Sequence, residues 1–217
     1  MLTNRSSSDP SAPLATSSLP PPSRQRFAPR NVVDAQGEHV IVHDGRALRL
    51  RSIEANDVAA LQQCFTRLSP EAIRRRFQHA MAELPAPMAR RLCQIDCEIE
   101  TALVLLDDGV LPAEIRGVGR LFVDEPTDSA EFSVLVEHSW GHLGLGSLLL
   151  RRLIADGRQR GLAELWGYVL VENQPMLELC RELKFERHLM QNEPGTVRVA
   201  LRLQSLGNSA VGPVEST

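Results

Sequence analysis

Three glycines, Gly141, Gly144 and Gly146, stand between an apolar run and a leucine-rich segment that also carries arginines. The run from Phe132 to Val136 predicts a strand, and the segment after Gly146 predicts a helix. Glycine allows the backbone to approach a ligand closely, and the first N–H groups of a helix supply hydrogen-bond donors and a partial positive charge. The stretch 131–161 therefore predicts a site for a phosphorylated ligand.

Two common phosphate-binding patterns do not fit this loop. A P-loop requires a lysine followed by Ser or Thr after its last glycine, whereas Ser147 and Leu148 follow Gly146 here. A dinucleotide-binding fingerprint requires a third glycine three residues on, an early position in the chain and an acidic residue after the next strand. This chain does not meet those requirements. The pattern that remains is the pyrophosphate loop of proteins that bind acyl-CoA.

A carboxylate stands at the start of the strand that leads into the loop. A carboxylate beside a ligand site can take a proton from a bound group, directly or through water, and so act as a general base. Glu131 is the candidate for this role. Strand alternation places Glu131 on one face of the strand with Ser133 and Leu135. The alternative is an ordinary strand-end carboxylate in solvent.

Length and composition indicate one globular domain. The 217 residues carry a formal net charge of −3, a pI of about 6.1 and 43% hydrophobic residues. The charge argues against a general nucleic-acid binder, and no apolar run approaches the ~18 residues that span a bilayer, so neither partner is expected. The N-terminus has no signal-peptide core.

The four cysteines do not form the paired C-x-x-C pattern of a zinc site, so we expect no metal. Free thiols in a reducing cytoplasm are the preferred interpretation. Cys93 and Cys97 lie one helical turn apart if that segment is helical, which leaves a transient disulfide open.

The residues between two polar tails are expected to form the folded unit. Residues 1–35 are rich in Ser and Pro and predict a disordered tail, residues 36–204 predict the domain, and residues 205–217 predict a second flexible tail. Within these bounds we expect no fused regulatory domain.

The order of elements predicts the fold class. We expect helices through Leu61 and Phe65, with Asn56 or Asp57 as cap, at 69–80, at 85–95, after the glycine loop and at 175–183. We expect strands at 39–43, 47–53, 101–106, 115–123, 131–136, 165–171, 185–190 and 197–203. The order β-β-α-α-α-β-β-β-α-β-α-β-β predicts an α/β fold with a mixed sheet.

Residues 130–185 resemble the GNAT superfamily of acyl-CoA-dependent N-acetyltransferases. The run Gly141-His142-Leu143-Gly144-Leu145-Gly146 matches the pyrophosphate loop R/Q-x-x-G-x-G/A of that family except at its first position. The run VLVEN at 169–173 and the run MLELCRELKF at 176–185 are similar to the strand and helix that follow it.

The resemblance extends upstream of the loop. LSPEAIRRRF at 68–77 and IDCEIETALVLL at 95–106 are similar to the GNAT domains of bacterial protein-lysine acetyltransferases. The likeness covers most of 46–204. It implies a mostly antiparallel central sheet with one splayed parallel pair and helices on both faces.

The resemblance also implies which residues bind acetyl-CoA as co-substrate. The backbone of Val134, Leu135 and Val136 would pair with the pantetheine arm like an added strand. Asn173, after the next strand, would hydrogen-bond the amides of the co-substrate. The loop and the start of the helix would hold the pyrophosphate, through Gly141, His142, Leu143, Gly144, Leu145, Gly146 and Ser147.

Four positions depart from the family pattern. Lys184 replaces the glycine that commonly precedes the closing phenylalanine, here Phe185. Gly141 stands where the family has Gln or Arg, so one side-chain contact to the phosphates is lost. His142 stands where glycine is frequent, and a negative φ would accommodate it. Cys180 stands where a tyrosine usually serves as general acid. Cys180 is therefore the candidate donor of a proton to the CoA thiolate, and an ordinary core cysteine is the alternative.

These features predict an N-acetyltransferase that moves an acetyl group from acetyl-CoA to an amine by direct transfer in a ternary complex. A protein lysine is the preferred acceptor. Two alternatives stay open, namely a small-molecule amine as acceptor and a degenerate domain that senses acyl-CoA without turning it over. We expect a cytoplasmic monomer or homodimer.

Overall fold

One eight-stranded sheet organises the molecule, with strand order β1-β2-β3-β4-β5-β6-β8-β7. The computed structural model describes residues 37–77, 81–190, 193 and 195–203. The predicted tails, 1–35 and 205–217, lie outside the described residues. The strands are β1 (Glu38–Ile41), β2 (Ala47–Ser52), β3 (Glu100–Asp107), β4 (Glu114–Asp124), β5 (Ser129–Val136), β6 (Glu164–Leu170), β7 (Glu186–Leu189) and β8 (Thr196–Arg202).

Five α-helices flank the sheet in the described part of the chain. They are α1 (Val58–Thr66), α2 (Pro70–Phe77), α3 (Ala86–Cys93), α4 (Leu145–Gln159) and α5 (Gln174–Glu182). Three short 3-10 turns, η1 (Ala55–Asp57), η2 (Glu125–Thr127) and η3 (His138–Trp140), connect elements. The predicted order of strands and helices is therefore confirmed.

The sheet is antiparallel except at one place. The chain meanders through β1 to β5, each strand antiparallel to the one before it. It then crosses through α4 to β6, which runs parallel to β5. A parallel neighbour requires such a crossover, whereas antiparallel strands are joined by short turns. The predicted mixed sheet with one parallel pair is confirmed.

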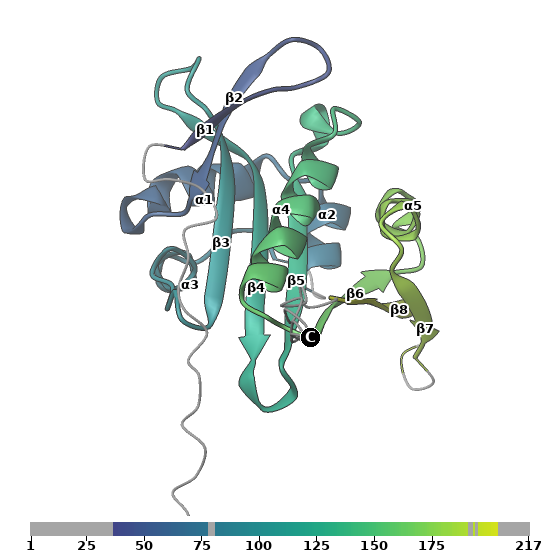
Figure 1. Ribbon diagram of the computed structural model, residues 1–217. Coiled ribbons are helices and arrows are strands. Elements are labelled where there is room, and N and C mark those ends of the chain that lie inside the picture. Colours follow the sequence, from purple (N-terminus) through teal and green to yellow (C-terminus); the bar gives the residue numbers. More distant parts are fainter. Residues whose placement is uncertain (1–36, 78–80, 191–192, 194, 204–217) are drawn as a thin grey trace, which may run out of the picture.

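The two faces of the sheet carry separate hydrophobic cores. In Figure 1, α4 lies in front of the sheet and α2 lies behind it. Leucines of α4, among them Leu149 and Leu153, pack with α5 residues against one face. Leu61 and Phe65 of α1 pack with α3 against the other face. Because successive side chains of a strand point to opposite faces, each central strand contributes residues to both cores. Helices therefore cover both faces, as predicted.

Local sequence signals account for several element boundaries. The Ala72 N–H donates to the Ser69 hydroxyl at 3.1 Å, so Ser69 caps α2 as predicted. Gly45 has φ of 86° in the hairpin turn between β1 and β2. Asp57 precedes α1 but makes no side-chain cap bond there. Its carboxylate instead binds Arg51 at 2.7 Å, which explains why it is buried.

The cysteines are unpaired. Cys64, Cys93 and Cys180 are buried and Cys97 is exposed. Among the described residues, no group of His, Cys, Asp and Glu is arranged to hold a metal ion. None of their helices has the length and apolar character that crossing a membrane requires.

Candidate active site

The parallel strands β5 and β6 separate after a short paired stretch. Their registered pairs are Ser129 with Glu164, Ala130 with Leu165 and Glu131 with Trp166. Beyond these pairs β5 keeps β4 as its partner as far as Val136, and β6 keeps β8 as far as Leu170. Figure 1 shows β6, β8 and β7 turning away from β5. The sheet therefore opens between β5 and β6.

The diverging part of β5 contains the predicted pantetheine-binding residues. Val134, Leu135 and Val136 are half-buried and pair with β4 along one backbone edge. Their other edge faces the opening between the strands. A free strand edge can accept an extended amide-containing ligand as an added strand. The structure thus places these residues where such a ligand would enter the sheet.

The glycine loop begins where β5 ends and turns directly into α4. Gly144 has φ of 85° and is the residue before the helix, and its carbonyl accepts a bond from the Leu148 N–H at 2.9 Å. In the first turn of a helix the N–H groups have no partner within the helix. Leu145, Gly146 and Ser147 form that first turn, so their N–H groups are available as donors for an anion.

One residue of the loop other than glycine has left-handed backbone. His142 has φ of 62°, and not the negative φ that would accommodate its side chain more easily. Left-handed backbone is uncommon for residues other than glycine, but His is among the residues that adopt it more often. Glycine, which is frequent at this position in the family, adopts this conformation without steric cost. The His142 side chain is exposed.

The β1–β2 hairpin turn reaches the glycine loop, which the sequence did not indicate. The guanidinium of Arg46 lies 3.6 Å from the ring centroid of Trp140, the buried residue just before Gly141. A Cβ atom on Gly144 would lie 3.4 Å from Nε2 of His43. Two residues separated by about a hundred positions from the loop therefore add nitrogen groups beside it. Only the Asp44-Gly45 turn signal pointed to a hairpin at this place.

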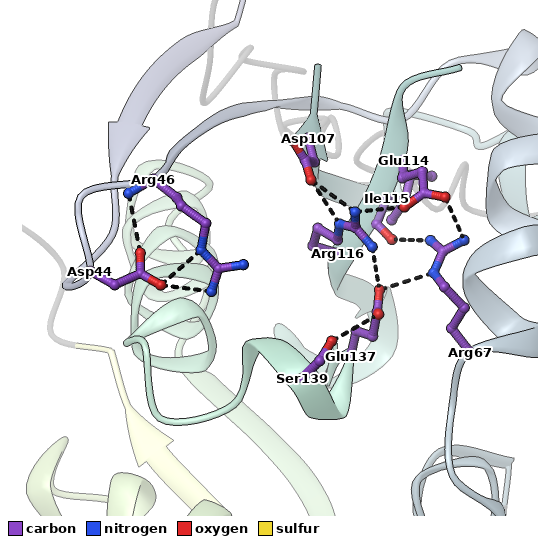
Figure 2. Close-up of polar contacts among 9 residues, drawn as sticks. All are labelled: Asp44, Arg46, Arg67, Asp107, Glu114, Ile115, Arg116, Glu137 and Ser139. Atoms are coloured by element: carbon purple, nitrogen blue, oxygen red, sulfur yellow. Dashed lines mark hydrogen bonds and ion pairs between the residues drawn. The ribbon is translucent and has the colours of Figure 1, made fainter. Parts of the chain in front are cut away.

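A charged network holds the entry to the loop. Glu137, between β5 and η3, accepts bonds from Arg67 Nε and Arg116 Nη1, each at 3.1 Å. Its other oxygen accepts the Ser139 hydroxyl at 2.9 Å. Figure 2 shows these side chains converging from α1, β4 and η3. Arg116 also binds Asp107 at 2.8 Å, so the network ties the loop to three elements.

The same network changes the acidity of Glu137. Burial raises the pKa of this carboxyl, but hydrogen bonds from Arg116, Arg67 and Ser139 together outweigh burial and lower the pKa below its usual value. A carboxyl whose pKa is depressed by folding stabilises the protein above its unfolded pKa of about 4.3. That stabilisation is lost as the pH falls from there through the folded pKa.

We therefore expect Glu137→Gln to lower the free energy of unfolding at pH 7 by roughly 1.5–3 kcal/mol, the range for hydrogen bonds to charged groups. The difference from the unsubstituted protein should shrink as the pH falls below about 4.3, because the carboxylate is then protonated first in the unfolded state and, below its lowered pKa, also in the folded state. Urea unfolding at a series of pH values measures both effects. A difference that is the same at pH 7 and pH 3 would contradict this assignment.

The candidate base lies at the last paired position of β5. Glu131 is exposed, and its cross-strand neighbours are Phe122 of β4 and Trp166 of β6. It lies on the face covered by α1 and α3, because Ser133 and Leu135 of the same face line a cavity beneath α1. Glu131 makes polar contacts of its own and is not an isolated charge. The carboxylate thus stands where the sheet opens.

The cavity next to Ser133 and Leu135 is small and partly open to solvent. Leu61 and Phe65 of α1 contribute to a mostly apolar lining. Cys64, also in the lining, has its pKa raised to about 12, chiefly by burial. Such a thiol is protonated at neutral pH and is not a nucleophile.

Cys180 and Asn173 lie on the other side of the opening. Cys180 is fully buried in the core beneath α5, and burial raises the pKa of its thiol to about 12. Asn173 is half-buried and is the residue before α5, where its side chain makes no cap bond. Its carbonyl accepts the Leu177 N–H at 3.0 Å. The side-chain amide of Asn173 is therefore not used to start the helix.

Comparison with known proteins identifies the fold and the family. The family model described as "Acetyltransferase (GNAT) family" matches residues 61–185, more than half of the 217 residues. The chain belongs to this family. The match includes β5, the glycine loop, β6 and α5, which together form the site described above. GNAT proteins are acetyltransferases that use acetyl-CoA, and the open strand edge and the loop donors fit that co-substrate.

Three solved structures illustrate the likeness of the GNAT fold. The GNAT domain of PAT from S. lividans is 24% identical with a TM-score of 0.69, and the match covers 78% of this chain and 99% of that one. Spermidine N-acetyltransferase from Vibrio cholerae, in complex with CoA and spermine, is 18% identical with a TM-score of 0.57, covering 72% and 95%. The ribosomal-protein-S18-alanine N-acetyltransferase from Escherichia coli is 20% identical with a TM-score of 0.55, covering 75% and 97%. At these identities the likeness concerns the fold.

Proposed function

We propose that this GNAT protein transfers an acetyl group from acetyl-CoA to the side-chain amine of a protein lysine, directly, in a ternary complex. The observation that carries the proposal is the place of Glu131. Its carboxylate is exposed on the last residue of β5 that pairs with β6. Backbone for pantetheine and a carboxylate for the amine therefore lie on one strand, a few residues apart.

The co-substrate would be held by backbone groups along one path. Val134, Leu135 and Val136 would pair with the pantetheine arm in the opening, and the N–H groups from His142 to Ser147 would bind the pyrophosphate. The Asn173 amide would bind the amides of the pantetheine arm. Gly141 offers no side chain to the phosphates, but Arg46 of the hairpin lies over Trp140 and His43 lies beside Gly144. We include these two residues in the phosphate site.

The proton movements follow from the groups present. Glu131 takes one proton from the lysine ammonium, and the freed nitrogen lone pair forms the C–N bond to the thioester carbon as the C–S bond breaks. The second N–H proton goes to the departing CoA thiolate, directly or through water. Cys180 is a poor donor for this step, because its thiol is buried and its pKa is raised to about 12. A thiolate with a pKa near 8.5 needs little help to leave.

Incubation of the protein with acetyl-CoA and lysine-containing proteins, followed by mass spectrometry, tests the proposal. We expect a mass increase of one acetyl group on lysine side chains and release of one CoA thiol for each. Acetylation of free polyamines without modification of any protein would favour the small-molecule alternative. Binding of acetyl-CoA without thiol release for any amine would favour a degenerate domain that senses acyl-CoA. The missing side chain at Gly141 is the observation that supports this alternative.

The proposal also concerns location and assembly. The four unpaired cysteines support a reducing compartment, the cytoplasm, because exposed Cys97 would be open to oxidation elsewhere. We propose a monomer or a homodimer, with no nucleic acid, membrane or metal as partner.

A further inference from the structure

Aromatic side chains gather around Glu131. The sequence has only six Phe, two Trp and one Tyr. Phe122 lies opposite Glu131 on β4, and Trp166 lies opposite it on β6. Neighbouring strands are about 4.8 Å apart, so the carboxylate has an aromatic neighbour on either side. The single tyrosine, Tyr168, is two residues beyond Trp166 on the same face, and the two rings meet edge to face with centroids 5.3 Å apart.

This group of aromatic residues faces solvent and is not part of either core. Phe122 is 46% exposed and Tyr168 is 37% exposed. The alternate residues of the same strands, such as Leu121, Leu165 and Val169, are buried on the face of α4 and α5. The helices α1 to α3 cover the sheet over β4 and β5 but make few or no contacts with β6 in the described part of the chain. Aromatic side chains are therefore displayed beside the opening.

The charges around this surface favour a cationic ligand. The η2 turn that joins β4 to β5 adds Asp124, Glu125 and Asp128 to the carboxylate of Glu131. Two of the arginines near this surface are paired with carboxylates. Arg120 binds Glu100 at 2.5 Å. Arg198 binds Glu164, and its guanidinium lies 5.1 Å from the centroid of Trp166.

We propose that Phe122, Trp166 and Tyr168 form an acceptor surface that binds the alkylammonium side chain of a protein lysine and delivers it to Glu131. The inference rests on the proposed function and names the part of the site that selects the acceptor. An aromatic face attracts an ammonium group through its quadrupole, and the four-carbon stem of lysine packs on aromatic carbon. The ammonium is bound while charged, and Glu131 then removes its proton.

A protein side chain fits this surface better than a free polyamine does. The surface is open, since Phe122 and Tyr168 are exposed and α1 to α3, as far as they are described, make few or no contacts with β6 on this face. A small amine is retained best in a concave pocket that buries most of its surface. A lysine on a protein brings its own neighbouring chain, which can rest on the exposed strand surface and the acidic η2 turn.

The first test measures steady-state kinetics with a blocked pentapeptide that carries one central lysine. For Phe122→Leu and Tyr168→Leu we expect KM for this peptide to rise about 5-fold each, the scale of a partly exposed cation–π contact of about 1 kcal/mol. The Kd for acetyl-CoA should not change. Tyr168→Phe keeps the ring and should behave like the unsubstituted protein. Ile41→Ala, an exposed apolar residue on β1, is the matched control.

An unchanged peptide KM in both leucine variants would overturn the inference. A rise in KM for spermidine with no effect on the peptide would also overturn it, because the surface would then serve a small amine.

A second measurement needs no turnover and so separates this inference from the proposed function. In a Trp140→Phe variant, Trp166 is the only tryptophan and reports ligand binding through its fluorescence. We expect the lysine peptide to bind at least about 5-fold more tightly than the same peptide with norleucine, which keeps the stem and lacks the charge. Equal binding overturns the inference. Tighter binding of the lysine peptide without any CoA release would support the surface and contradict the acetyltransferase reaction.

Discussion

Replacing Glu131 by Gln is expected to lower kcat by about 100- to 10,000-fold, the range that general acid–base catalysis contributes. Gln keeps the size and the hydrogen-bonding oxygen of the side chain but cannot take a proton. The exposed position of Glu131 beside the opening means that its replacement should not disturb folding. The Kd for acetyl-CoA should stay within about two-fold, because pantetheine and pyrophosphate are bound by backbone groups elsewhere. Initial rates of thiol release and calorimetric titration measure the two quantities.

A matched control for this variant lies in the same row of the sheet. Glu186 of β7 aligns with Trp166 through Ala200 of β8, and its side chain is 65% exposed. Glu186→Gln removes the same charge from a site remote from the opening and should leave kcat unchanged. Equal loss of activity in both variants would point to a general effect of surface charge. Unchanged turnover in Glu131→Gln would remove this residue from the mechanism.

The order of the elements can be predicted from the sequence because local signals agree with the global fold. The alternating run Ala47–Ser52 forms β2, and Ser69 with Pro70 starts α2 as a cap and first-turn proline do. Boundaries shift by a few residues. The first strand ends at Ile41 and not at His43, because Val42 closes the hairpin turn by donating to Arg46 and accepting from Gly45.

The candidate site could be predicted where it depends on one continuous segment. Strand, loop and helix from β5 to α4 follow each other in the chain, so residue types and spacing predict which backbone groups would meet a phosphate. The left-handed φ of His142 could not be predicted, because a side chain usually disfavours it. The family match covers this segment as well, and sequence pattern and fold point to the same ligand.

Contacts between distant segments could not be predicted. Arg46 reaches Trp140 only because the β1–β2 hairpin folds toward the loop. Phe122 and Trp166 become neighbours of Glu131 through the register of the strands. A slip of one residue would place their side chains on the opposite face of the sheet. A single sequence does not specify the register in which two strands pair, and the turn between β4 and β5 is compatible with several registers. The residues of the acceptor surface are therefore identified from strand pairing and not from a sequence motif.

Asp156→Ala is expected to cost roughly 3–5 kcal/mol of the free energy of unfolding, the range for breaking a buried ion pair. Asp156 has no exposed area and lies in α4, the helix whose first turn we propose as part of the phosphate site. Its Oδ2 accepts the Thr101 hydroxyl at 2.6 Å and Arg160 Nε at 3.0 Å. Without the carboxylate, Arg160 would remain as a charge in a buried position, held only by main-chain carbonyls and the Thr101 hydroxyl.

A variant that removes both charges distinguishes the effect of the ion pair from the effect of side-chain packing. In the double variant Asp156→Leu with Arg160→Met no uncompensated charge remains, so most of the stability should return. Glu178→Ala, which breaks an exposed pair with Arg181, should change the free energy of unfolding far less than Asp156→Ala does. Urea unfolding midpoints at constant slope measure all three variants. If the double variant were as unstable as Asp156→Ala, apolar packing around α4, and not the buried pair, would decide how firmly this helix is held on the sheet.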